Sequence, residues 1–402
     1  MLTPDRIEAA AGRIRNAVYE SPLVYSETLT GLTRNAVYLK LENLQVTGAF
    51  KERGALNRLL TMSEDQRRRG VVAASAGNHG QGIAYHASRL GIAAQIWMPR
   101  HTPLIKVMAT RGYGAEVVLE GQDYDETYGA AVQRSAEGGL TFLHAFDDED
   151  VIAGQGTIGL EILASGIAPD AVVVPVGGGG LIAGIACAIK SRRPDVRVIG
   201  VQTARLPSAL AALQQNEPVL LPAAPTLADG IAVRRSGAVT LPLLRQYVDQ
   251  IVTVEEEEIA AAILVLLERE KTLAEGAGAA ALAAALYGKI GCRGERLAVL
   301  ISGGNLDVSM LARIIERGLT KDGRRLRVRI HLPDYPGTLQ GVVSVIARNH
   351  ANIVETSHNR AHYGVSLGET AIDITMETRG PEHVEQLLAE LNAAGYRCSR
   401  VN

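Results

Sequence analysis

One lysine in the sequence stands where a side chain can do covalent chemistry. Residues 37–41 alternate as a β-strand does, residues 47–48 (Thr-Gly) suit a turn, and leucines recur at helical spacing across 51–60. Lys51 therefore lies in the first turn of a predicted helix, beside Phe50. Backbone N–H groups and partial positive charge at such a terminus disfavour an ammonium ion, so the pKa of Lys51 should fall. A partly neutral lysine can form an imine with an aldehyde, although a solvated surface lysine is the more common case.

Two further stretches have the form of anion-binding loops. Residues 75–82 (SAGNHGQG) follow a short apolar strand and open a helix, so their N–H groups point above the edge of a sheet. Residues 177–180 are four glycines between an apolar strand and a helix, and without Cβ atoms their amides can surround a phosphate. The residues of the phosphate loop GxxxxGK[ST] are missing here, which disfavours nucleoside triphosphate hydrolysis. Taken singly, each stretch fits a plain turn as well.

The elements around these motifs alternate between strand and helix. Apolar stretches such as 71–74 (VVAA) and 171–176 (AVVVPV) are interleaved with helical patterns such as 255–270. This alternation predicts parallel sheets covered by helices on both faces. We therefore expect an α/β region over residues 1–320, with a small α/β unit at about 41–145 and a large one in the remainder.

The pattern changes near residue 320. Residues 321–327 are short, charged and turn-forming, so we expect a linker there. Residues 328–402 then show strand, helix, two strands, helix and strand. The order βαββαβ predicts a ferredoxin-like domain.

Composition and length limit the class of protein. A chain of 402 residues with a formal net charge of −2 and 47% hydrophobic residues suits a globular protein of two or three domains. Neither a basic patch nor a long apolar run suggests nucleic acid or membrane as a partner. The first 20 residues lack a signal-peptide core, and three scattered cysteines suggest neither a disulfide nor a metal site. These features favour a cytoplasmic protein.

Four motifs, in this order along the chain, resemble those of the threonine/serine dehydratases, which are pyridoxal-phosphate enzymes of fold type II. They are KLENLQVTGAFKERGA around Lys51, SAGNHGQG at 75–82, VGGGGLIAG at 176–184 and ISGGN at 301–305. The C-terminal region resembles a single ACT domain, a small amino-acid-sensing module. The resemblance implies a two-domain catalytic fold like that of the tryptophan synthase β chain, with pyridoxal 5′-phosphate between the domains.

The resemblance also implies a role for particular residues. Lys51 would hold the cofactor covalently and move the proton on the substrate Cα. Cofactor contacts are implied for Lys51, Phe50, Asn78, Gly177, Gly178, Gly179, Gly180, Leu181 and Ser302. Substrate carboxylate contacts are implied for Ser75, Gly77, Asn78 and His79, and regulatory contacts for Asp334 and Gly337. Ser302 would face the pyridine nitrogen as a neutral partner, which favours β-elimination over transamination.

The activity implied is deamination of L-threonine to 2-oxobutanoate and ammonia, and of L-serine to pyruvate, in isoleucine biosynthesis or in threonine catabolism. Serine racemase and 3-hydroxyaspartate ammonia-lyase of the same fold are the alternatives. Racemases of this fold carry SSGN where this chain has Ala76, and residues 201–208 lack the carboxylates of their cation site. No metal is therefore expected.

An amino-acid sensor that has lost catalysis is a hypothesis of another class, and the intact Lys51 argues against it. The ACT-like region suggests an amino-acid effector and a homo-oligomer, either dimer or tetramer.

Overall fold

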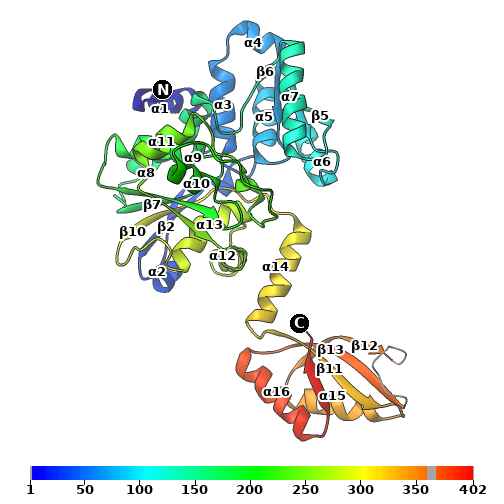
Figure 1. Cartoon of the computed structure of the whole chain (residues 1–402). Helices are drawn as coiled ribbons and strands as arrows, with labels where there is room; N and C mark the ends of the chain where they lie inside the picture. Colours follow the sequence, from blue (N-terminus) through cyan, green and yellow to red (C-terminus); the bar gives the residue numbers. More distant parts are fainter. Residues whose placement is uncertain (1, 360–367, 402) are drawn as a thin grey trace. The chain divides into compact units, whose positions relative to one another are not determined.

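The computed structural model describes residues 2–359 and 368–401 (Figure 1). The chain divides into two compact units, residues 1–306 and 307–402. Among the described residues, no helix is long and apolar enough to cross a membrane.

The first unit contains a six-stranded sheet in which all neighbours except β1 and β2 are parallel. Its order is β1 (Leu23–Ser26), β2 (Ala36–Leu41), β10 (Arg296–Ile301), β7 (Ala171–Pro175), β8 (Arg197–Thr203) and β9 (Gln250–Val254). Every residue of β7 is buried, as expected for a parallel strand that is covered on both faces.

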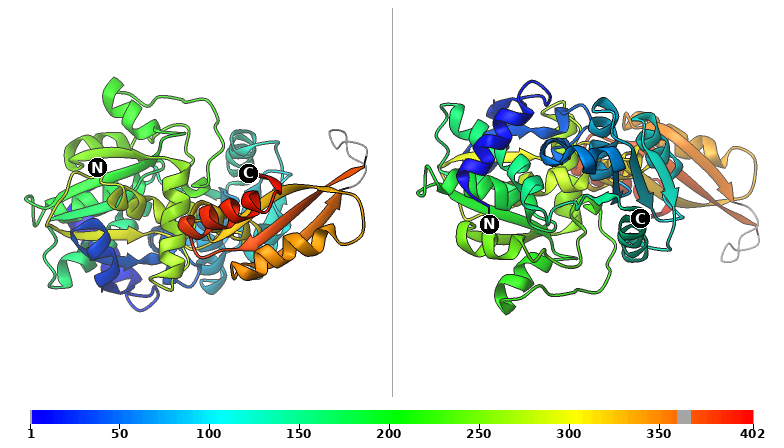
Figure 2. Two further views of the ribbon diagram at one scale, coloured as in Figure 1. Left: turned by 90° about the horizontal axis from the view of Figure 1, so that it is seen from below. Right: turned by 90° about the horizontal axis from the view of Figure 1, so that it is seen from above.

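Helices cover both faces of this sheet (Figure 1). One face packs against α8 (Glu149–Ala164), α9 (Gly180–Lys190), α10 (Ser208–Gln215) and α11 (Thr240–Tyr247). The other face packs against α13 (Gly276–Leu286), which α12 (Glu256–Glu268) and α2 (Glu27–Thr33) cover in turn. The N-terminal helix α1 (Pro4–Ile14, dark blue in Figure 2) packs on α8 from outside.

A second, parallel sheet of four strands completes the first unit. Its order is β5 (Glu116–Leu119), β4 (Ala94–Met98), β3 (Val71–Ala74) and β6 (Thr141–Phe142). One face packs against α3 (Lys51–Thr61), α5 (Asn78–Arg89) and α6 (Leu104–Gly112), and the other against α7 (Tyr124–Gly138). A short helix, α4 (Glu64–Arg69), joins α3 to β3.

Glycines let three helices of the first unit approach closely. A Cβ on Gly54 of α3 would lie 2.7 Å from the Val151 carbonyl oxygen of α8. A Cβ on Gly184 of α9 would lie 2.4 Å from the Ile152 carbonyl oxygen of the same helix. These contacts are closer than any side chain permits, so α8 joins the helix that begins at Lys51 to the helix that follows the glycine loop.

The second unit has the predicted ferredoxin-like order after a leading helix, α14 (Val308–Lys321). Strand β11 (Arg325–Pro333), helix α15 (Thr338–Arg348), strands β12 (Asn352–Asn359) and β13 (Glu369–Glu377), helix α16 (Pro381–Ala393) and strand β14 (Arg397–Arg400) follow. The antiparallel sheet has the order β12-β13-β11-β14, and both α15 and α16 pack on one face. The expected linker at 321–327 holds the last residue of α14, a turn and the start of β11, so the chain divides earlier, after Leu306.

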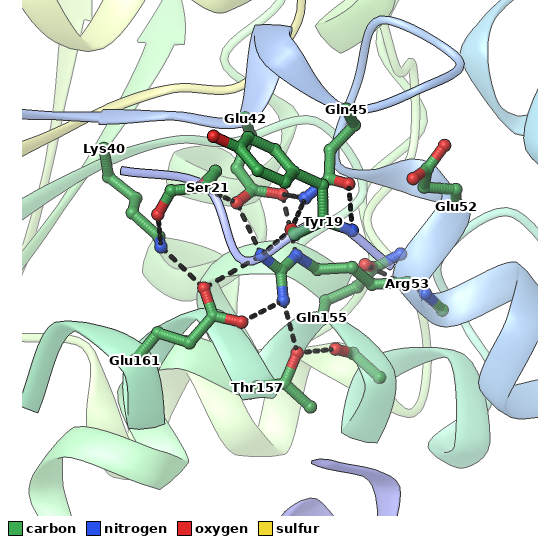
Figure 3. A network of polar contacts seen from close by, with 12 residues as sticks. Tyr19, Ser21, Lys40, Glu42, Gln45, Glu52, Arg53, Gln155, Thr157 and Glu161 are labelled. Atoms are coloured by element: carbon green, nitrogen blue, oxygen red, sulfur yellow. Dashed lines mark hydrogen bonds and ion pairs between the residues drawn. The ribbon is translucent and has the colours of Figure 1, made fainter. Parts of the chain in front are cut away.

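A buried ionic network fixes α3 to the rest of the first unit (Figure 3). The guanidinium group of Arg53, 1% exposed, bonds both carboxylate oxygens of Glu42 at 2.8 Å and those of Glu161 at 2.5 and 2.9 Å. The Lys40 ammonium group donates to Glu161 at 2.5 Å and to the Ser21 carbonyl oxygen. Burial alone would raise the pKa of Glu42, but the charge and hydrogen bonds of Arg53 hold it below its ordinary value.

Removing the Arg53 guanidinium should therefore destabilise the first unit strongly. We expect Arg53→Met to lower the free energy of unfolding by about 3–5 kcal/mol, because Glu42 would remain buried without its partner. Urea unfolding followed by circular dichroism measures the change. Arg193→Met is the matched control: Arg193 and its partner Asp195 are both solvent-exposed, so little or no loss of stability is expected. Equal losses in both variants would contradict a structural role for the network.

Candidate active site

A cavity of about 940 Å³ lies within the first unit. Parallel strands of both sheets point their carboxyl ends at it. Lys51 follows β2, Ser75 follows β3, Gly177 follows β7 and Ser302 follows β10, and all four residues line the cavity. Ligands of open parallel sheets bind at such edges, so the topology brings distant motifs together.

Lys51 is the first residue of α3, as the sequence predicts. Its Nζ donates to the Ala145 carbonyl oxygen at 3.0 Å and lies 5.2 Å from the centre of the Phe50 ring. Burial lowers the pKa of Lys51 to about 8, although the negative charge of Glu275 opposes this. A substantial fraction of the amine is therefore neutral near pH 8. The direction matches the sequence-based expectation, but its largest cause is burial rather than the helix terminus.

The glycine loop between β7 and α9 presents unused backbone donors. Within the described residues, no group accepts from the N–H groups of Gly177, Gly178, Gly179, Gly180 or Leu181. Gly179 has φ +100°, which favours glycine, and a Cβ on Gly178 would lie 2.3 Å from the Phe146 ring. The Thr240 hydroxyl donates to the Gly178 carbonyl oxygen at 2.7 Å and so fixes the loop. Such a row of amides at a helix N-terminus binds a phosphate well.

The SAGN segment lies across the cavity, at the start of α5. The Ser75 hydroxyl accepts from the N–H groups of Gly77 and Gly80 at 3.3 and 3.1 Å, so it shapes the turn. The N–H groups of Ala76, Asn78 and His79 find no acceptor in the described part of the chain. These amides suit a carboxylate.

The ring of His79 does not take part in this anion site. Burial lowers its pKa to about 3, so the ring is neutral, and its Nε2 bonds the Leu143 carbonyl oxygen at 3.1 Å. His79 therefore faces the cavity through its backbone N–H group.

Ser302 follows the last residue of β10 and is 2% exposed. Its hydroxyl lies 3.5 Å from the Ala277 carbonyl oxygen, a long contact that leaves it free to bond a group in the cavity.

Glu275 is a residue of the cavity that the sequence does not predict. Its side chain is 5% exposed, and its Oε1 accepts from the Asn78 amide at 2.6 Å. Burial, and next the charge of Asp229, raise the pKa of Glu275 to about 7. One signal was present in the sequence: this glutamate stands directly before an uninterrupted run of small apolar residues at 276–286. A charge at the entrance of a buried helix requires a partner.

His144 also lines the cavity without being predicted. Its Nδ1 accepts from the N–H groups of Phe146 at 3.2 Å and Asp147 at 2.8 Å. Burial lowers its pKa, which favours the neutral ring, and in the neutral ring the two bonds that Nδ1 accepts assign the proton to Nε2. Histidine at this position is therefore a fixed hydrogen-bond donor.

Asp334 and Gly337 lie in the second unit, between β11 and α15. The Asp334 N–H group donates to the Gly368 carbonyl oxygen at 2.9 Å, and Gly337 caps α15 with φ +96°.

A family model described as pyridoxal-phosphate dependent enzyme matches residues 14–303. The chain belongs to this family. L-threonine ammonia-lyase of Thermotoga maritima is 48% identical over 396 residues, and the match covers 98% of both chains. The processed form of threonine deaminase isoform 2 from Solanum lycopersicum is a similar solved structure, with 37% identity and a TM-score of 0.74 over 78% of this chain and 93% of that one. The structure of maize serine racemase is also similar, with 30% identity and a TM-score of 0.75. The match covers 80% of this chain and 98% of the racemase chain.

The α/β fold and the cofactor class expected from the sequence are thereby confirmed. The cavity also fits pyridoxal phosphate on physical grounds. It combines an amine of lowered pKa, a buried hydroxyl at Ser302 and a row of unused amides that matches a phosphate.

The close contact between Gly178 and Phe146 gives a test of the glycine loop. We expect Gly178→Ala to weaken binding of pyridoxal phosphate about tenfold or more, because displacing the loop loses charge-assisted hydrogen bonds of about 1.5–3 kcal/mol each. Fluorescence titration of the cofactor-free protein measures the affinity. Gly12→Ala on α1, where a Cβ meets open space, is the control and should bind as tightly as the unmodified protein. Unchanged affinity in Gly178→Ala would exclude this loop from the phosphate site.

Proposed function

We propose that this chain deaminates L-threonine to 2-oxobutanoate and ammonia, and L-serine to pyruvate, with pyridoxal phosphate. The observation that carries the proposal is the position of the Lys51 amine, inside a cavity between two sets of unused backbone amides. The similarity to L-threonine ammonia-lyase of Thermotoga maritima extends over nearly the whole chain and supports threonine as the substrate.

We propose the following cofactor-binding residues. Lys51 holds the aldehyde carbon, Phe50 packs against the ring and Asn78 donates to the ring oxygen. Ser302 faces the ring nitrogen, and the phosphate lies on the N–H groups of Gly177, Gly178, Gly179, Gly180 and Leu181. Pyridoxal phosphate supplies an electron sink that stabilises negative charge at the substrate Cα.

The substrate carboxylate lies on the start of α5. Ser75 and Gly77 shape this turn, and the backbone N–H groups of Asn78 and His79 bind the carboxylate. These contacts fix the substrate at Cα next to Lys51. A pKa of about 8 lets Lys51 accept the Cα proton near neutral pH and return it later.

The overall reaction balances without an external oxidant or reductant. The Cα–H bond and the Cβ–O bond break, so water leaves the amino acid. Water then returns when the unsaturated amine hydrolyses to the 2-oxo acid and ammonia.

Elimination is favoured over racemisation by Ala76. Racemisation needs a second acid that returns a proton to the opposite face of Cα, and the methyl group of Ala76, which lines the cavity, has none to give.

Lys51→Ala tests the chemistry directly. We expect a folded, colourless protein without measurable lyase activity, because the variant lacks the amine that holds the cofactor and accepts the Cα proton. In the unmodified protein this amine lies beside the Ala145 carbonyl oxygen. The assay measures 2-oxo acid release from L-threonine, L-serine and 3-hydroxyaspartate, and D-serine formation from L-serine. Threonine should give the highest kcat/KM and D-serine should stay at background. Turnover by Lys51→Ala would remove Lys51 from the mechanism, and D-serine as the main product would favour a racemase.

We also propose that the second unit is an ACT-like regulatory module. Its loop at Asp334 and Gly337 opens a helix N-terminus, which suits the carboxylate of a small amino acid. Among the described residues, β12 and β14 are the edge strands of its sheet, and such edges favour pairing between subunits and hence a homo-oligomer, either dimer or tetramer. We propose the cytoplasm as the location.

Deletion of residues 307–402 separates catalysis from regulation. We expect residues 1–306 to bind pyridoxal phosphate, because every residue of the cavity lies in this range. The response to added branched-chain amino acids, or the mass in solution by light scattering, should change. If the truncated protein keeps the same kinetics, the same effector response and the same number of subunits, the module contributes neither to regulation nor to assembly.

A further inference from the structure

The amide of Asn78 is held at both ends. Its Oδ1 accepts from the Asn305 amide at 2.7 Å, and its Nδ2 donates to Glu275 Oε1 at 2.6 Å. Asn305 is itself fixed, because its Nδ2 also donates to the Thr47 carbonyl oxygen at 2.7 Å. Each amide nitrogen carries two hydrogens, so Asn78 keeps one N–H that is free to donate to a molecule in the cavity.

Rotation of the Asn78 amide by 180° would exchange its oxygen and its nitrogen. The oxygen would then face Glu275, and wherever that carboxylate is ionised two acceptors would lie 2.6 Å apart. The nitrogen would at the same time face the donor of Asn305. Asn305 and Glu275 together therefore permit only one orientation of Asn78.

The backbone at Gly303 leaves space for the carboxylate of Glu275 and also bonds its main chain. A Cβ on Gly303 would lie 2.5 Å from Glu275 Oε1, so only glycine at that position leaves room for the carboxylate. The Glu275 N–H group donates to the Gly303 carbonyl oxygen at 3.0 Å, which anchors the backbone at the same point. Two independent contacts with one glycine place Glu275 at the entrance of α13.

We propose that Glu275 is a positioning residue that acts through Asn78: it fixes the amide so that the free N–H faces the cofactor. This inference rests on the proposed function. It adds a buried carboxylate, which no motif in the sequence indicates, to the residues that support the reaction.

Besides burial, three charged groups and one amide hydrogen bond act on this carboxylate. Asp229 raises the pKa of Glu275, whereas Lys106 and Lys51 lower it, and Asn78 lowers it through the hydrogen bond. Lys106 and Asp229 form an ion pair at 2.9 Å at the edge of the cavity, so their charges largely offset each other. Glu275 consequently ionises as the pH rises through about 7, and the bond to Asn78 strengthens in the same interval.

The test compares Glu275→Leu, which removes the acceptor, with Glu275→Gln, which keeps a neutral oxygen in its place. We expect Glu275→Leu to lower kcat about tenfold or more, and Glu275→Gln to stay within about threefold of the unmodified protein at pH 8. In Glu275→Gln the pH dependence of kcat should lose its change near pH 7. Glu116→Leu, at the exposed first residue of β5 and outside the lining of the cavity, is the control and should leave kcat unchanged.

A double-mutant cycle tests whether Glu275 acts through Asn78. If it does, Asn78→Ala combined with Glu275→Leu should be no slower than Asn78→Ala alone, within about twofold. Losses that multiply would overturn the proposal, because Glu275 would then act independently of Asn78.

The absorbance spectrum of the bound cofactor provides a readout that does not depend on turnover. The pH at which this spectrum changes should shift both in Asn78→Ala and in Glu275→Leu, and should stay unshifted in Glu116→Leu. A shift in Asn78→Ala alone would overturn the role of Glu275. If the unmodified protein deaminates none of the amino acids tested, the proposed function fails while the spectral comparison still decides the role of Glu275.

Discussion

The two bidentate ion pairs of Arg53 are the interaction on which the catalytic unit depends. Burying a guanidinium and two carboxylates has a high desolvation cost, which only complete pairing offsets. Arg53 meets this requirement by bonding Glu42, the residue after β2, and Glu161 of α8 at the same time. It lies two residues after Lys51 on α3, so the network that satisfies its charge also fixes the position of the lysine.

Helix α8 extends this constraint to the phosphate site. It is packed against α3 through Gly54 and against α9 through Gly184, closer than side chains would permit. The row of amides that begins α9 is therefore held at a fixed position relative to Lys51. Lys51 and the glycine loop follow two strands of the same sheet, β2 and β7. Helix packing, rather than contact between them, sets their relative position.

Short motifs next to strands could be predicted from the sequence, and contacts between distant segments could not. Lys51 and the glycine loop are each recognisable within a few residues, because strand, turn and helix signals surround them. Glu275 bonds an amide 197 residues away, and that distance has no local signature. Helix α13 begins after it as a run of glycine, alanine and leucine that has no polar face, because the helix is buried between the sheet and α12. Amphipathic periodicity therefore gives no signal for it.

The unused amides from Gly177 to Leu181 have a consequence for handling the protein. They belong to the folded chain itself, so their affinity for an oxyanion does not depend on the rest of the cofactor. Inorganic phosphate and sulfate in a buffer compete for the same donors, and by mass action they lower the fraction of protein that holds the cofactor. Cofactor occupancy measured after purification is thus a property of the buffer as well as of the protein.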